Sequence, residues 1–278
     1  MDNHFLNDQW VTSDDLKISI FDLSVVRGFG CFDFLRTYNN KPFRLKDHID
    51  RFFTSAKLLG LTVPKTKKEI EKIIIAGLNK NGVYEKNIKI ILTGGRTEDG
   101  ITPDGKQELI VIFTQVVEYP KEYYEKGVKL TTIKAERTIP EAKSLDYTAA
   151  VLAMMTAKKL GAEEALYIDE KDRIYEATRC NFFAVIDKKI ITPKKGILMG
   201  ITRKIVIELA RKLKISFSER DIYLKEISSF EEAFITASNK QIMPVRLIDK
   251  DKVGNGKVGE ITKRLIVAFS QLTQGKQG

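Results

Sequence analysis

The sequence is poor in the residues that mark disulfide-rich and zinc-binding proteins. It has two cysteines and two histidines, and Cys31 and Cys180 form no CxxC pair and have no histidine at ligand spacing. Neither a disulfide framework nor a metal site is therefore expected. No apolar run approaches the ~20 residues that span a bilayer, and the first residues lack the pattern of a secretion signal. We expect a cytoplasmic protein with no membrane partner.

The net charge of +10 raises the question of a nucleic-acid partner, because clustered lysines supply much of the non-specific affinity for phosphate backbones. Clustering is missing here. The lysines are interleaved with acids, as in residues 65–72 and 163–172, which is typical of a solvated surface. Hydrophobic residues make up 43% of the chain and charged residues 30%, which indicates an ordinary globular protein without a nucleic-acid partner.

The length of 278 residues favours two domains over one. We expect a small N-terminal α+β domain at 1–118, a linker at 119–127, and a larger C-terminal α+β domain at 128–278. Helical spacing predicts helices near 47–60, 68–79, 149–160, 203–213 and 260–272, and strand patterns occur at 17–23, 88–93, 108–117, 128–135, 165–168, 174–185 and 233–237. Hairpins and helices are mixed rather than alternating, so the fold class is α+β.

A glycine-containing run, Arg27-Gly-Phe-Gly-Cys-Phe-Asp-Phe34, has two familiar interpretations that both fail. A dinucleotide-binding fingerprint needs a third glycine where Asp33 stands. The aromatic RNA-binding strand of an RRM is a closer match, but a strand, a helix and another strand precede it in that fold. Only 26 residues precede Arg27, which is too few, so an RNA-binding protein is the disfavoured alternative.

The second half of the chain carries several short motifs in a fixed order. They are Lys143-Ser-Leu-Asp-Tyr147, Glu176-Ala-Thr-Arg-Cys-Asn181, Thr192-Pro193, Gly200-Ile-Thr-Arg203 and Met243-Pro-Val245. With these motifs the chain resembles the class IV (fold-type IV) aminotransferases from about residue 20 to residue 265, and it is most similar to the D-amino-acid transaminase branch. Branched-chain L-amino-acid aminotransferase and aminodeoxychorismate lyase share the fold and the lysine, and they remain alternatives.

The resemblance implies a two-domain enzyme that binds pyridoxal 5'-phosphate, with Lys143 carrying the cofactor as a Schiff base. A lysine beside a cationic cofactor has a lowered pKa, so it can form the imine and then move the α-proton of the substrate. Glu176 lies where the family places the carboxylate that keeps the pyridine nitrogen protonated. Tyr147 and Asn181 are expected beside the cofactor ring.

The resemblance also assigns donors to the cofactor phosphate. They are Arg51, the N–H groups and hydroxyl of Ile201 and Thr202, and Ser238, where the family more often has threonine. The second of these has a physical reason of its own, because a helix N-terminus presents unpaired N–H groups and a partial positive charge to an anion.

The expected substrate site departs from the family pattern. In typical D-amino-acid transaminases an arginine and a histidine on the loop after the strand at residue 88 bind the substrate carboxylate, but here residues 94–105 contain no histidine and only Arg96. Arg27 and Arg179 are our hypothesis for the replacement anchors, with Phe32 as a pocket wall. We predict a homodimeric transaminase that moves an amino group between a D-amino acid and a 2-oxo acid such as 2-oxoglutarate or pyruvate.

Overall fold

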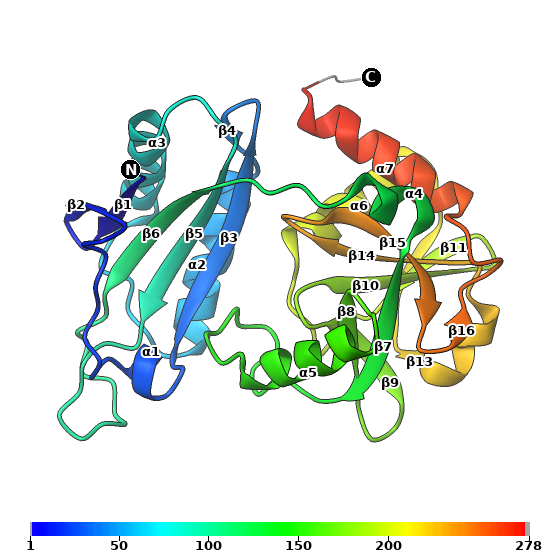
Figure 1. Cartoon of the computed structure of the whole chain (residues 1–278), viewed down its shortest axis with the longest axis horizontal. Coiled ribbons are helices and arrows are strands. Elements are labelled where there is room, and N and C mark those ends of the chain that lie inside the picture. Colours follow the sequence, from blue (N-terminus) through cyan, green and yellow to red (C-terminus); the bar gives the residue numbers. More distant parts are fainter. Residues whose placement is uncertain (1, 276–278) are drawn as a thin grey trace. The chain divides into compact units, whose positions relative to one another are not determined.

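The computed structural model describes residues 2–275, which divide into two compact units (Figure 1). The N-terminal unit contains the chain up to Val117 together with Ala142–Tyr147, and the C-terminal unit contains Glu118–Glu141 and the chain from Thr148 onward. The boundary lies beside the one expected from the sequence. The segment with Lys143, however, groups with the N-terminal unit and not with the larger unit to which the sequence assigned it.

The N-terminal unit is built on an antiparallel sheet with the strand order β2-β1-β6-β5-β3-β4. Its strands are β1 (Asn3–Leu6), β2 (Gln9–Thr12), β3 (Gly30–Tyr38), β4 (Lys41–Pro42), β5 (Lys86–Thr93) and β6 (Leu109–Gln115). Its helices are α1 (Leu23–Val26), α2 (Leu45–Leu58) and α3 (Lys67–Lys80).

One face of this sheet is covered by α2 and α3, as Figure 1 shows. Ile88, Ile90 and Leu92 alternate along β5 and pack with Phe52 of α2 and Ile74 of α3 in a fully buried core. Because successive strand residues point to opposite faces, the residues between them belong to the other face of the sheet. That second face is where candidate site residues of β3 and β5 lie.

The C-terminal unit is built on a mixed sheet with the order β12-β11-β10-β14-β15-β7-β8-β9-β13, and β9 also pairs with β10. Its strands are β7 (Val128–Lys134), β8 (Glu164–Ile168), β9 (Arg173–Ala177), β10 (Asn181–Ile186), β11 (Lys189–Thr192), β12 (Phe217–Glu219), β13 (Ile222–Tyr223), β14 (Glu232–Ala237), β15 (Gln241–Ile248) and β16 (Asp251–Lys252). The extra pairing closes the central strands into a ring and sets Glu176 opposite Asn181.

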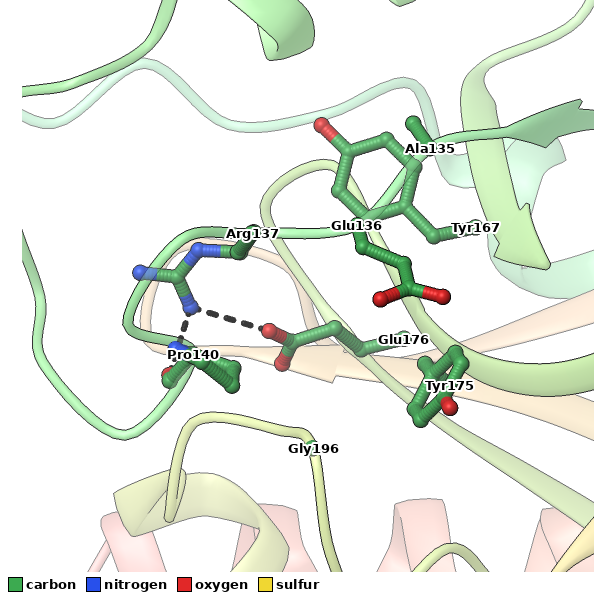
Figure 2. Close-up of a pocket in the computed structure, with 8 residues that line it drawn as sticks. All are labelled: Ala135, Glu136, Arg137, Pro140, Tyr167, Tyr175, Glu176 and Gly196. Carbon is green, nitrogen blue, oxygen red and sulfur yellow. Dashed lines mark hydrogen bonds and ion pairs between the residues drawn. The ribbon is translucent and has the colours of Figure 1, made fainter. Parts of the chain in front are cut away.

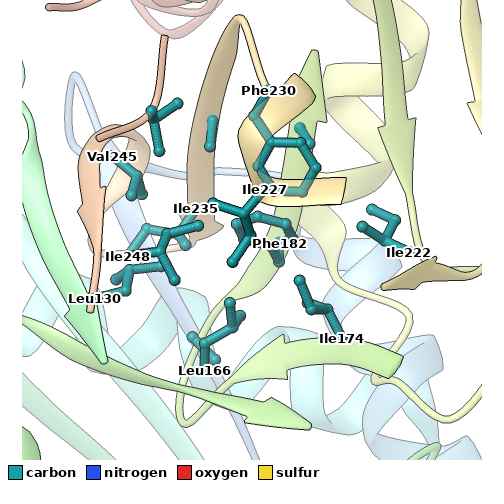
Figure 3. Packing of buried hydrophobic residues seen from close by; sticks show 14 of the residues in the cluster. Leu130, Leu166, Ile174, Phe182, Ile222, Ile227, Phe230, Ile235, Val245 and Ile248 are labelled. Carbon is teal, nitrogen blue, oxygen red and sulfur yellow. The ribbon is translucent and has the colours of Figure 1, made fainter. Parts of the chain in front are cut away.

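Large apolar side chains fill the middle of this ring, among them Leu166, Phe182, Phe230, Ile235 and Ile248 (Figure 3). The helices of the unit are α4 (Lys121–Lys126), α5 (Thr148–Lys159), α6 (Ile201–Lys212), the 3₁₀ helix η1 (Leu224–Ser229) and α7 (Glu260–Thr273). At roughly 25 cal/mol for each Å² of buried apolar surface, this core is the main stabilising term of the unit.

Three sequence-based expectations differ from the structure. Residues 17–21 form no strand, although their polar and apolar residues alternate, and the chain enters α1 at Leu23. The expected linker is structured, since it contains α4, and Tyr119 and Tyr124 pack against the core. The expected strand 174–185 is two strands, because the chain turns at 178–180.

Candidate active site

The segment with Lys143 is held along the start of β3 in the N-terminal unit. Phe32 donates its backbone N–H to the carbonyl of Lys143 (2.9 Å), and Leu145 donates to the carbonyl of Gly30 (2.9 Å). The N–H of Lys143 donates to Oγ of Ser55 on α2 (3.0 Å). The backbone of the candidate cofactor lysine is therefore fixed from both sides by regular secondary structure.

Gly30 is needed for this close approach. Its φ is +152°, and an added Cβ would lie 2.6 Å from the carbonyl oxygen of Leu92 and 2.7 Å from Cδ1 of Leu145. Any side chain would push the lysine segment away from the sheet. Gly30, which belongs to the glycine-containing run at residues 27–34, therefore has a packing role beside Lys143.

Lys143, Phe32 and Tyr147 come together on the second face of the N-terminal sheet. Nζ of Lys143 lies 4.5 Å from the centroid of the Phe32 ring, and the Tyr147 ring meets the same ring edge-on at 5.6 Å. Nζ of Lys89, from β5, lies 4.9 Å from the Phe32 centroid. Burial lowers the pKa of the Lys89 ammonium, and within residues 2–275 it makes no ion pair.

Arg51 is held by a buried carboxylate. Nε of Arg51 donates to Oδ2 of Asp33 (2.8 Å) and its NH2 donates to Oδ1 (2.9 Å), while His48 contacts Oδ1 through Nδ1 (2.7 Å). Burial alone would raise the pKa of Asp33, but the charge of Arg51 and the contacts with Arg51 and His48 hold it well below its usual range. Asp33 therefore stays ionised and orients the guanidinium of Arg51, the expected phosphate donor.

Glu176 is the centre of a hydrogen-bond network in the C-terminal unit. Its Oε1 accepts from NH1 of Arg137 (3.0 Å), and its Oε2 accepts from Nδ2 of Asn181 (3.1 Å) and from the backbone N–H of Leu198 (3.1 Å). The side chain of Glu176 is buried, with 6% of its surface exposed. A carboxylate with this many donors is held in one orientation.

A pocket opens beside this carboxylate, as Figure 2 shows. Its walls are formed by Arg137, Tyr167, Tyr175 and Glu176, together with Gly196. NH1 of Arg137 also donates to the carbonyl of Pro140 (2.7 Å), which ties the guanidinium to the loop after β7. The pocket is small and polar at one end, and the Glu176 carboxylate lines it.

The start of α6 lies near this network. Gly200 is the N-cap of α6, and an added Cβ would lie 1.9 Å from Oδ1 of Asn181, so only glycine fits between the helix start and that amide. The N–H groups of the first turn, which includes Ile201 and Thr202, have no carbonyl partner within the helix. The N-terminus of a 12-residue helix such as α6 favours an anion.

A second polar group without a partner shares this region. Thr236 pairs across the sheet with Asn181, so the two side chains lie on one face. Its Oγ1 is buried and has no hydrogen-bond partner among the described residues. Ser238 follows two residues later, half-buried at the end of β14. An orphaned hydroxyl and an uncapped helix start fit a site that donates hydrogen bonds to a bound group.

The two arginines proposed as substrate anchors lie in different units. Arg27 is exposed at the end of α1, where its NH1 donates to the carbonyl of Val26 (3.0 Å). Arg179, in the turn between β9 and β10, donates from Nε (2.8 Å) and NH2 (2.7 Å) to Oε1 of Glu164, and 44% of its side chain is exposed. The arginine of the usual anchor loop, Arg96, is exposed as well.

Arg137 and Lys89 are site residues that the sequence did not single out. Arg137 lies six positions before Lys143 but in the other unit, and no periodicity links it to Glu176. Lys89 interrupts an apolar strand at a position whose neighbours 88 and 90 are fully buried. Because successive strand residues point to opposite faces, Lys89 lies on the face opposite Ile88 and Ile90, and the strand pattern alone does not mark it as a site residue.

Neither a metal centre nor a membrane span is found in the described chain. Residues 2–275 contain no group of three or more His, Cys, Asp or Glu side chains that could hold a metal ion. None of the helices in the same range is long and apolar enough to cross a membrane.

Comparison with known proteins gives a consistent family. The model of the class IV amino-transferases matches residues 30–248. A Methanocaldococcus jannaschii protein assigned provisionally as a branched-chain-amino-acid aminotransferase is 35% identical, covering 96% of this chain and 95% of its own. The D-alanine aminotransferase of Staphylococcus epidermidis is 32% identical, covering 97% of both chains.

A solved structure agrees with the expected fold. The branched-chain amino acid aminotransferase of Escherichia coli matches with a TM-score of 0.94 and 26% identity. The match covers 100% of this chain and 96% of that one. The fold-type IV architecture predicted from the sequence is thereby confirmed.

Proposed function

Since this chain belongs to the class IV aminotransferases, we propose that it transfers an amino group between a D-amino acid and a 2-oxo acid such as 2-oxoglutarate or pyruvate. Its cofactor is pyridoxal 5'-phosphate, which when bound supplies an electron sink for the charge that develops at the substrate α-carbon. The branched-chain and D-alanine relatives leave the substrate class open.

The residues of this chain suit that cofactor. In the N-terminal unit, Lys143 would hold it covalently, with Tyr147 beside its ring and Arg51 as a phosphate donor. In the C-terminal unit, Glu176 and Asn181 would face the pyridine nitrogen. The phosphate would receive hydrogen bonds from the start of α6 at Ile201 and Thr202 and from the hydroxyl of Ser238.

Two residues do the chemical work in this proposal. Once the substrate amine has replaced Lys143 on the cofactor, the freed Nζ of Lys143 would take the proton from the substrate α-carbon and return it, acting as the general base and acid. The carboxylate of Glu176, held by three donors, keeps a positive charge on the group it faces. Arg137 positions Glu176 through the ion pair of 3.0 Å.

Because both enantiomers of an amino acid carry an α-carboxylate, we base the preference for D-amino acids on the 32% identity with the D-alanine aminotransferase of Staphylococcus epidermidis. The observation that carries the proposed carboxylate anchor is the position of Arg179. It lies in the turn between Glu176 and Asn181, so the same hairpin carries the expected ring-facing residues and a partly exposed guanidinium. Glu164 fixes one edge of that guanidinium. The remaining edge suits the α-carboxylate of a substrate. Arg27 is the second anchor, and its exposure is compatible with that role.

Lys89 also supports an anionic substrate. Its ammonium group is partly buried, has a pKa lowered by burial, and lies over the same ring as Nζ of Lys143. An unpaired cation in such a place is costly unless an anion arrives. A substrate carboxylate is the anion that the proposed reaction supplies.

Transamination of branched-chain L-amino acids is the second candidate. It is favoured by the 35% identity with the Methanocaldococcus jannaschii protein. The apolar wall at Phe32, which is 9% exposed, would suit a branched side chain as well. No contact among the described residues favours the aminodeoxychorismate lyase alternative.

A substrate panel separates the two candidates. The purified holoenzyme is mixed with D-alanine, D-glutamate, L-leucine or L-valine, and the visible absorbance of the cofactor is followed through a single turnover. We expect turnover of the D-amino acids. Rapid turnover of L-leucine with none of D-alanine or D-glutamate would replace the D-amino-acid proposal with the branched-chain one.

Variants test the anchors in the same assay. Arg179→Ala and Arg27→Ala should each raise KM for D-alanine by about one to two decades, the cost of one charge-assisted hydrogen bond. Arg173→Ala is the matched control, because Arg173 also pairs with a buried acid, Asp169, and is 35% exposed. Arg96→Ala tests the usual anchor loop and should leave KM unchanged.

We also propose a homodimer in the cytoplasm. Val151, Leu152 and Met155 form an apolar strip on α5 with 55%, 59% and 54% of their surfaces exposed. Ile20 and Phe21 are similarly exposed in the N-terminal unit, at 70% and 69%. Such groups are usually covered in an assembly. Sedimentation should give a dimer, and Met155→Glu should shift it toward monomer; a fully active monomeric wild type would refute this.

A further inference from the structure

A completely buried lysine, Lys240, belongs to the same turn as Ser238. Lys240 is 0% exposed, and its Nζ makes an ion pair with Oε1 of Glu164 (2.9 Å) and another with Oε1 of Glu163. The ammonium also lies 4.8 Å from the centroid of the Tyr119 ring. Lysine is almost never fully buried unless it is paired. We therefore expect the Lys240 ammonium to have a role that an apolar side chain could not have.

The same carboxylate oxygen also binds Arg179. Oε1 of Glu164 accepts from Nε and NH2 of Arg179 and from Nζ of Lys240, at 2.8, 2.7 and 2.9 Å. The other oxygen, Oε2, accepts from the hydroxyl of Thr178. Glu164 is 0% exposed, so these protein groups and not water balance its charge. It is shared between the buried lysine and the proposed carboxylate anchor.

The formal charges of this cluster sum to zero. Glu163 and Glu164 contribute two negative charges, and Lys240 and Arg179 contribute two positive charges. Burial alone would lower the pKa of the Lys240 ammonium, but its neighbours Cys180, Glu164 and Glu163 raise it above its ordinary value. Lys240 is therefore positively charged at every pH at which the enzyme would be active.

The cluster also joins two turns. Asn181 pairs with Thr236, so the 178–180 turn at the start of β10 lies beside the 238–240 turn at the end of β14. Glu164 binds residues of the first turn, and Lys240 belongs to the second. The carbonyl of Lys240 accepts from the hydroxyl of Tyr124 (3.1 Å), which fixes the backbone of that turn as well.

We propose that Lys240 is a positioning residue for substrate binding, which shares the charge of Glu164 so that Arg179 remains able to bind the substrate carboxylate. Without Lys240, Arg179 is the only cation that compensates the charge of Glu164. The attraction of Arg179 for the substrate carboxylate is then weaker. This inference rests on the proposed role of Arg179 in the transaminase reaction. The lysine touches neither substrate nor cofactor and acts through Glu164.

Binding titrations of the holoenzyme test this proposal. D-alanine and D-alaninol, which has the same amine but no carboxylate, are titrated while the cofactor absorbance is followed. Lys240→Met should weaken D-alanine binding about tenfold, as expected for weakening one charge-assisted hydrogen bond. D-alaninol binding should not change. Lys240→Arg should restore D-alanine binding, because it returns the charge. Equal loss for both ligands would mean that the lysine only supports the fold, and the proposal would fall.

A charge-balanced variant controls for destabilisation of the fold by an uncompensated buried charge. Lys240→Met alone leaves an excess buried negative charge, whereas Glu163→Gln with Lys240→Met keeps the net charge of the cluster at zero. In the double variant Arg179 is still the only charged partner of Glu164. We therefore expect the same tenfold loss of affinity for D-alanine. Glu163→Gln by itself is its control and should bind D-alanine normally. Normal binding by the double variant would overturn the proposal.

A double-mutant cycle separates this inference from the proposed function. Lys240→Met should have no further effect on D-alanine binding in the Arg179→Ala background, because it acts through that arginine. An additive loss would contradict the proposed route. If Arg179→Ala itself leaves D-alanine binding unchanged, the anchor in the proposed function fails. If Arg179→Ala weakens D-alanine binding but Lys240→Met does not, Arg179 remains the proposed anchor and only the role of Lys240 is wrong.

Discussion

Arg137 and Glu176 form a hydrogen-bonded ion pair with 3.0 Å between NH1 and Oε1, although they are 39 positions apart in the sequence. The pair is partly buried, with 19% and 6% of the two side chains exposed. Water therefore screens it less than a surface pair. The ion pair holds the candidate ring-facing carboxylate in one direction, which the proposed proton abstraction requires.

Glu176→Gln should keep the cofactor bound and slow proton abstraction on the order of 10²-fold, the usual cost of removing one preorganised electrostatic contact. The amide keeps the size of the side chain but cannot hold a positive charge opposite it. The measurement is the single-turnover rate with deuterated and undeuterated D-alanine.

Glu136→Gln is the matched control for that variant. Glu136 lines the same pocket, but the Glu176 hydrogen bonds do not include it. We expect its single-turnover rate to equal that of the wild type. If both variants behave alike, the role of Glu176 is wrong.

Arg51→Met should destabilise the protein in the absence of cofactor, by about 3–5 kcal/mol, because Asp33 would be left as a buried charge with only His48 beside it. Urea unfolding of the cofactor-free protein measures this. Lys67→Met is the control, since Lys67 pairs with Asp50 while both are about half exposed, and it should cost less than about 1 kcal/mol. If Arg51→Met and the wild type have equal free energies of unfolding, Arg51 does not stabilise the cofactor-free protein, and its only role would be to bind the phosphate.

Stability should fall as the pH drops below about 6.5, the ordinary histidine value. Burial, the largest cause, lowers the pKa of His48, while Asp33 opposes it and Arg51 and Lys143 add to it. The unfolded chain therefore binds a proton at a pH where the folded chain does not. Each pH unit in that window costs up to about 1.4 kcal/mol.

His48→Gln should flatten this slope between pH 6.5 and the folded-state pKa. A smaller slope should remain, because burial also lowers the pKa of His4. Free energies of unfolding, measured at several pH values for the wild type and His48→Gln, test whether His48 causes the slope. A slope that is unchanged in the variant would exclude His48 as the source.

Local pattern predicted the helices better than the β9–β10 hairpin. Glu176 and Asn181 were named from the family resemblance, whereas the strand pattern predicted one strand at 174–185 and missed the turn that sets the two residues opposite each other. The helices that cover the sheets follow local apolar spacing, and α3 and α7 start within two residues of their predicted positions. These features depend on neighbours in sequence, which a single chain displays directly.

Long-range pairing could not be predicted in the same way. The segment around Lys143 binds β3 more than 100 positions away, so its membership of the N-terminal unit depends on a tertiary contact. Asp33 appeared only as the residue that breaks a glycine motif, although it is the buried partner of Arg51. The pairing of Arg179 and Lys240 through Glu164 joins three separate strands or turns. None of these has a local sequence signal.

The covalent attachment point of the cofactor tests the central claim most directly. The holoenzyme is reduced with sodium borohydride, digested with a protease, and the peptides are analysed by mass spectrometry, with Lys143→Ala treated in parallel. We predict that the phosphopyridoxyl mass appears on the peptide containing Lys143 and is absent from the variant. The same mass on Lys89, whose ammonium lies over the same Phe32 ring, or on any other lysine, would contradict the account.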